Sequence, residues 1–131
     1  MIELPRAVVS VEPRTALADP HRGRRARFSS MDRIDYFARA VEEAPQVARA
    51  RFGYAVELQR AGRYDEAITQ YRAYLELQED EGNAWGRLAE SLAATGDRDG
   101  AADAYLAGID QATKFGHHSM ADELRVGLEG L

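Results

Sequence analysis

The sequence predicts an all-α protein built from repeated helix–turn–helix units. Three observations lead to this prediction. Similar residues recur 34 positions apart, apolar residues within each unit fall at helical spacing twice, and no proline follows Pro45 in the 131-residue chain. Proline breaks a helix interior because it lacks a backbone N–H and clashes with the preceding turn. The length fits one domain with a core of its own.

The repeat is visible in residues that recur at the 34-residue spacing. Each pair combines identical or closely similar side chains, so the two segments are expected to fold alike. The pairs are Leu58 with Leu92, Ala55 with Ala89, Gly62 with Gly96, Ala67 with Ala101, Tyr71 with Tyr105, and Leu75 with Ile109.

The first predicted helix covers about 31–43 and belongs to a half repeat at 31–47. Its apolar residues lie 34 positions before those of the next unit's second helix, and Pro45 follows its end. Residues 14–27 are rich in arginine and contain Pro20 and Gly23 without an apolar stripe, so the unit lacks a first helix of its own. The stripe of the half repeat consists of Ile34, Phe37, Ala40 and Val41.

The first full repeat is predicted at 48–81. Its first helix presents Tyr54, Ala55 and Leu58 on one face. Gly62 follows the last apolar residue, where the chain must adopt a left-handed conformation that glycine takes at little cost. The second helix carries a longer stripe, made of Tyr64, Ala67, Ile68, Tyr71, Tyr74 and Leu75.

The second full repeat is predicted at 82–115. Four apolar residues at positions i, i+3, i+4 and i+7 define its first helix, and Gly96 marks the turn. The first stripe consists of Trp85, Leu88, Ala89 and Leu92, and the second of Ala101, Ala102, Tyr105 and Ile109.

The last segment, 116–131, is predicted to be a capping helix from about 119 to 130. It does not keep the 34-residue register, because Asp122 and Glu123 would then occupy core positions. Stacked repeats need such a helix to cover the apolar face of the last unit. Its stripe consists of Met120, Ala121, Leu124, Leu128 and Leu131.

The second repeat carries a motif specific enough to suggest a family. Trp85-Gly86-Arg87-Leu88-Ala89-Glu90-Ser91-Leu92, followed by Gly96, Ala101 and Tyr105, resembles the signature of the tetratricopeptide repeat (TPR). The resemblance covers residues 48–115 and departs from the family at Arg51 and Gly108. It implies antiparallel helix pairs in a short right-handed α-solenoid that binds another protein or peptide.

Residues 1–30 differ in charge from the rest of the chain. They hold six arginines against three acidic residues, whereas residues 31–131 hold 11 basic and 19 acidic side chains. We expect a flexible segment, with Met31 as an alternative natural start. An acidic domain repels phosphates, so a nucleic-acid role would rest on the cluster of Arg22, Arg24, Arg25 and Arg27.

No residue set predicts catalysis, a cofactor or a metal. The chain has no cysteine, and His117 and His118 are adjacent, so their side chains point in different directions and favour a loop. The acidic run 76–81 lacks the spacing of a calcium loop and predicts a solvated turn between repeats. No apolar stretch approaches the length of a membrane-spanning helix, and a cytoplasmic protein is expected.

The resemblance places a binding groove on the first helices of the repeats. Phe52 and Val56, four residues apart, are not required by the core stripe and could form an apolar floor. Alternatively, the N-terminal or the cap helix covers them. They also occupy the places where chaperone-binding relatives use Lys and Asn to bind a terminal carboxylate, which argues against that activity. The candidate groove residues are Arg49, Phe52, Val56, Gln59, Asn83, Gly86, Arg87 and Glu90.

The sequence therefore favours a non-catalytic adaptor that binds a peptide or helix of another protein. A self-associating structural protein is one alternative, since an apolar patch can pair by symmetry. A nucleic-acid-associated factor that uses the N-terminal arginines is the other.

Overall fold

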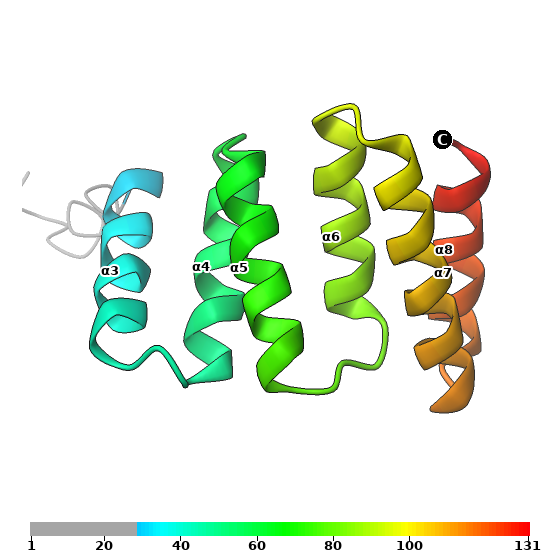
Figure 1. Cartoon of the computed structure of the whole chain (residues 1–131), viewed down its shortest axis with the longest axis horizontal. Coiled ribbons are helices and arrows are strands. Elements are labelled where there is room, and N and C mark those ends of the chain that lie inside the picture. The colour runs from blue at the N-terminus through cyan, green and yellow to red at the C-terminus, as the bar shows by residue number, and fades with distance from the viewer. Residues whose placement is uncertain (1–28) are drawn as a thin grey trace, which may run out of the picture. The chain divides into compact units, whose positions relative to one another are not determined.

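The computed structural model describes residues 29–131, and Figure 1 shows their helices. The Arg-rich segment predicted at 1–30 lies almost entirely outside this range. No strand occurs among residues 29–131, so the predicted all-α fold is confirmed. The helices are α3 (Ser30–Glu43), α4 (Ala48–Arg60), α5 (Tyr64–Leu77), α6 (Asn83–Ala94), α7 (Arg98–Lys114) and α8 (His118–Glu129).

Helix α3 begins with a capping box. The Ser29 hydroxyl accepts a hydrogen bond from the Asp32 backbone N–H at 3.3 Å, and the Asp32 carboxylate accepts one from the Ser29 N–H at 3.1 Å. Such a pair satisfies backbone donors that have no partner within the helix. The chain divides into the units Met1–Asp32 and Arg33–Leu131, and the packing below is that of the second unit.

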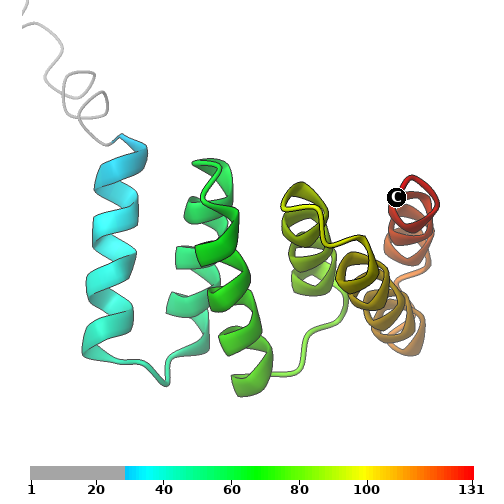
Figure 2. The same ribbon diagram turned by 45° about the horizontal axis from the view of Figure 1, so that its top comes forward.

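Consecutive helices pack against each other in chain order from α4 to α8. Figures 1 and 2 show α4 beside α5 and α6 beside α7. Within these pairs the helices run antiparallel, because tight turns at Gly62 and Gly96 reverse the chain. Both glycines have positive φ, 77° and 92°, as the sequence predicts. A third turn of this kind, at Gly116 with φ 78°, joins α7 to α8.

The core consists largely of the predicted stripes. Ala67 and Ala101 are fully buried, and the tyrosines four residues later in each repeat, Tyr71 and Tyr105, are buried as well. The buried residues from these stripes are Ile34, Val41, Ala55, Leu58, Ala67, Ile68, Tyr71, Tyr74, Leu88, Ala89, Leu92, Ala101, Tyr105, Ala121 and Leu124.

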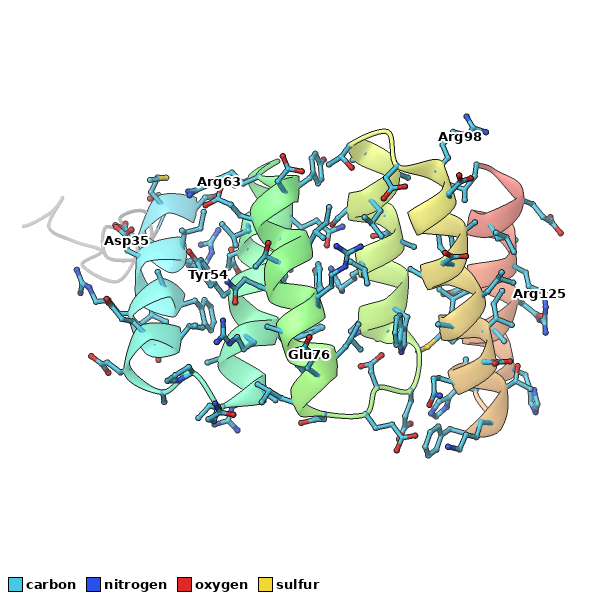
Figure 3. All side chains as sticks on the ribbon, viewed as in Figure 1. Asp35, Tyr54, Arg63, Glu76, Arg98 and Arg125 are labelled. Carbon is cyan, nitrogen blue, oxygen red and sulfur yellow. The ribbon has the colours of Figure 1, made fainter. Side chains whose placement is uncertain are left out.

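Helix α8 covers the end of the second repeat. A Cβ atom added to Gly86 would lie 2.7 Å from the Leu124 side chain, so α8 lies directly against α6. The opposite side of α8 is polar: Arg125 points outward (Figure 3) and pairs with Asp122 at 2.9 Å. Apart from Val126, which is 69% exposed, the exposed side chains of α8 are polar, and this distribution is compatible with the predicted capping role.

The acidic turn between the repeats is only partly solvated, which corrects the sequence-based expectation. Asp80 is 9% exposed. One of its carboxylate oxygens accepts hydrogen bonds from the N–H groups of Gly82 and Ala84 at 2.9 and 2.8 Å, and the other accepts one from the Tyr74 hydroxyl at 3.3 Å. Asp80 therefore caps the start of α6 and ties it to α5.

None of the helices in residues 29–131 combines the length and apolarity that crossing a membrane demands.

Candidate functional site

The predicted apolar floor is partly covered from within the molecule. Phe52 and Val56 are half-buried, and both pack against the core. The centroid of the Phe52 ring lies 6.0 Å from that of Tyr71 and 5.2 Å from that of Tyr74. Both tyrosines belong to α5. The structure thus favours intramolecular packing for this pair, with α5 as a covering element that the sequence analysis did not consider.

Gln59 links the two repeats through its side-chain amide. Its Nε2 donates a hydrogen bond to Oε1 of Glu90 at 3.1 Å, while its Oε1 accepts one from the Tyr71 hydroxyl at 2.5 Å. These bonds connect α4, α5 and α6 by side chains alone. The polar part of the predicted groove is therefore ordered by internal hydrogen bonds.

The tyrosine in this network titrates abnormally. Burial raises the pKa of Tyr71 to about 12, although the positive charge and hydrogen bonding of Arg87 act in the opposite direction. Burial also raises the pKa of Tyr105, and the negative charge of Glu90 adds to that shift. Glu90 is thus electrostatically coupled to the tyrosines of both repeats.

We expect the protein to lose stability at alkaline pH. An unfolded tyrosine has a pKa of about 10, and that of folded Tyr71 is about 12, so the folded state holds the proton more tightly. This contribution to stability is complete below the unfolded pKa and disappears as the pH rises through the folded pKa. Urea midpoints of wild type and Tyr71→Phe should converge between about pH 10 and 12. Midpoints that stay equally far apart over this range would contradict the assignment.

Three candidate residues of α6 line one hollow. Asn83 and Glu90 are exposed and Arg87 is half-buried. They face a hollow of about 430 Å³ whose other wall comes from α8, with Met120 and Leu124 among its lining residues. We call it the α6–α8 hollow. Gly86, also named in the sequence analysis, forms part of its floor.

Arg49 and Phe52 line a different hollow. It measures about 580 Å³ and lies between α3 and α4, with Phe37 and Ala40 on the α3 side. We call it the α3–α4 hollow. The residues predicted from sequence to form one groove therefore occupy two hollows, with Val56 and Gln59 lining neither. The sequence-based pattern did not reveal this division.

A third hollow of about 440 Å³ lies over α5, α6 and α7. Its floor contains Leu88 and Leu92, which are buried core residues, and its rim carries Arg72, Glu76 and Asp103. Figure 3 shows Glu76 on α5. No sequence pattern singled out this surface.

His117 and His118 lie at the start of α8, and His117 forms a contact with an acidic residue. Its Nε2 lies 2.5 Å from Oε1 of Glu81 in the turn before α6. In residues 29–131 no three histidine, aspartate or glutamate side chains are grouped closely enough to hold a metal ion.

Glu57 is a buried charged residue that the sequence analysis missed. It is 6% exposed, and its carboxylate pairs with Arg33 at 2.9 Å and with Arg60 at 3.2 Å. The Arg33 contact joins α3 to α4. The sequence gives little indication that Glu57 is buried and paired, because Arg33 lies 24 residues away and only folding brings the two charges together.

The tetratricopeptide-repeat family model matches residues 48–91, which comprise α4, α5 and most of α6. No curated protein sequence matches the chain. The matched helices have the antiparallel pairing, glycine turns and alanine–tyrosine packing described above, and α7 continues the pattern by pairing with α6. The match at residues 48–91 and the six helices of residues 29–131 together support a small protein of the tetratricopeptide-repeat type.

Proposed function

We propose that this protein is a non-catalytic interaction module that binds a peptide segment or helix of another protein in the α6–α8 hollow. TPR domains generally bind other proteins. The observation that carries the proposal is the convergence of Asn83, Arg87 and Glu90 on one open hollow with apolar side chains of α8. Specific recognition commonly combines an apolar surface with a few fixed polar groups.

The two charged residues differ in their freedom to meet a ligand. Glu90 is exposed, yet its carboxylate is positioned by Gln59. Arg87 is half-buried, its Nε is buried without a hydrogen-bond partner, and its guanidinium interacts with the Tyr71 hydroxyl. Groups fixed before binding lose little entropy when a ligand arrives. This arrangement favours a ligand that offers both a basic and an acidic or carbonyl group.

We expect a photocrosslinker at Asn83 to capture a specific partner from a lysate of the source cells. Asn83 is exposed, so benzoylphenylalanine there should be tolerated. In a Glu90→Lys background the yield should fall at least about tenfold, because the reversed charge repels the basic group that Glu90 attracts. The matched control places the crosslinker at exposed Thr69 on α5, outside the hollow.

The outcome assigns the binding surface. Equal capture from Thr69 and Asn83, or capture from Asn83 that Glu90→Lys leaves unchanged, would argue against the α6–α8 hollow. Circular dichroism confirms that each variant is folded. A solution mass of twice the monomer would instead favour self-association, the alternative drawn from the sequence.

A further inference from the structure

The α3–α4 hollow has counterparts elsewhere in the chain that are filled. Phe37 and Ala40 on its α3 side lie 34 residues before Tyr71 and Tyr74, which are 0% and 8% exposed. Phe52 of α4 covers those tyrosines. The hollow therefore lies where the first helix of the half repeat would pack.

The next repeat shows the same arrangement. Tyr105 and Gly108 on α7 correspond to Phe37 and Ala40, and both are buried. A Cβ atom on Gly108 would lie 2.9 Å from the Cβ of Trp85, a residue of α6. In both complete repeats a first helix thus covers the surface that, within residues 29–131, has no first helix over it on α3.

The corresponding segment of this chain is a poor candidate for the missing helix. In the 34-residue register it would comprise residues 14–26, which contain Pro20 and Gly23. A proline inside a helix costs about 3 kcal/mol and a glycine about 1 kcal/mol relative to alanine. The same segment offers no apolar stripe to place over Phe37 and Ala40.

A second copy of α3 is also a poor candidate, because of charge. A first helix runs antiparallel to its second helix, so the start of the bound helix would lie near the end of α3, where the hollow is lined by Glu43 together with Arg49 of α4. The first turn of a second α3 would bring exposed Asp32 toward Glu43. The positive end of a helix dipole with a basic side chain in its first turn would instead suit a carboxylate there.

The size of the residue on the second helix of each unit indicates which side chain the first helix packs against it, and hence which side chain the bound helix would present to α3. Where α7 has the small residue Gly108, α6 supplies Trp85. Where α5 has the large residue Tyr74, the aligned position of α4 holds Arg51, whose guanidinium bonds Gln70 instead. Ala40 is small, as Gly108 is. A close-packed interface at Ala40 therefore calls for a large aromatic side chain.

We propose that the α3–α4 hollow binds an amphipathic helix of another protein, antiparallel to α3, which completes the half repeat. This helix has about three turns, as α4 and α6 do. It places an aromatic side chain over Ala40 and a basic residue of its first turn near Glu43. The site is separate from the α6–α8 hollow, so it stands or fails independently of the function proposed above.

The test uses the full chain and a fluorescent peptide that carries the α6 sequence, Asn83–Ala94, with lysines at its outward positions and in its first turn. This sequence already fills the equivalent place against α7. We expect saturable binding by fluorescence anisotropy. Replacing the tryptophan of the peptide by alanine, or Ala40→Tyr in the protein, should weaken binding at least about tenfold, since buried aromatic anchors dominate helix recognition.

Matched controls distinguish binding in the α3–α4 hollow from binding at other surfaces. Asp35→Tyr adds the same ring to α3 outside the hollow, and Glu90→Lys changes a residue that lines the α6–α8 hollow and not the α3–α4 hollow; both should leave binding unchanged. Ala40→Tyr should remain folded, because Tyr74 occupies the equivalent place in the first repeat.

Three outcomes would overturn the proposal. The first is absence of saturable binding, or equal binding by wild type and Ala40→Tyr. The second is binding that occurs only after residues 1–28 are removed, which would make the chain's own N-terminal segment the occupant. The third is a dimer in sedimentation that Ala40→Tyr dissociates, which would make the occupant a second copy.

Discussion

Replacing Tyr71 by alanine is expected to lower the free energy of unfolding by about 3–5 kcal/mol, the usual cost of removing a large buried aromatic side chain. Tyr71 is 0% exposed, so the whole ring is buried in the native state. The ring packs edge-on against Phe52, and its hydroxyl donates to Gln59. Its loss leaves a cavity and an amide oxygen without a donor.

The effect should reach both repeats. Each unit of a repeat protein is stabilised mainly by its neighbours, so damage at their boundary weakens both. Domains of this size are stable by only about 5–15 kcal/mol, so the loss is a large fraction of the total. Urea denaturation provides the measurement, and the two full repeats should unfold with separate midpoints if their coupling is lost.

Two variants calibrate this result. Tyr71→Phe keeps the ring and should cost about 1 kcal/mol, the net value of one hydrogen bond. Tyr36→Ala removes a ring of the same kind that is 65% exposed, and should change stability by less than about 0.5 kcal/mol. A Tyr71→Ala cost as small as that of Tyr36→Ala would show that the ring is not a core element.

Periodicity predicts the helices because it is a local property. The stripe Trp85, Leu88, Ala89 and Leu92 needs only one helix face to be buried, and all but the half-buried Trp85 are buried in the structure. Gly62 and Gly96 are similarly local, since a positive φ favours glycine whatever lies around it. These signals sufficed for the all-α fold and the helix pairs.

The candidate site depends on packing between distant segments, which periodicity does not report. Phe52 looks free on its own helix, but two tyrosines about 20 residues later cover it. The division into two hollows follows from α3 and α8, which lie at opposite ends of the repeat array in sequence. The acidic run 76–81 looks solvated in the sequence, because the order of its residues does not show which of them turns inward on folding.

Asp80→Ala is expected to lower the free energy of unfolding by about 2 kcal/mol, the upper range for loss of a helix N-cap. The substitution removes the acceptor for the N–H groups of Gly82 and Ala84 and for the Tyr74 hydroxyl. These donors are buried, so water cannot readily take over the hydrogen bonds that the carboxylate accepts. Thermal or urea denaturation measures the loss.

The neighbouring acidic residues provide matched controls, because they are exposed. Glu79 pairs with Lys114 at 3.2 Å and Glu81 contacts His117. Exposed pairs contribute at most about 1 kcal/mol, so Glu79→Ala and Glu81→Ala should cost clearly less than Asp80→Ala. Three equal effects would mean that the turn acts only through its total charge, as expected for a fully solvated acidic run.

Asp80 also bears on the proposed binding surface, because α6 begins only three residues later with Asn83. In Asp80→Ala the first turn of α6 should fray, and the amide protons of Gly82 and Ala84 should exchange faster than in wild type. A frayed turn no longer positions Asn83, so crosslinking from that residue should weaken even at temperatures where the variant is folded. Retained exchange protection and full crosslinking would show that packing against α8, rather than the Asp80 cap, fixes the start of α6.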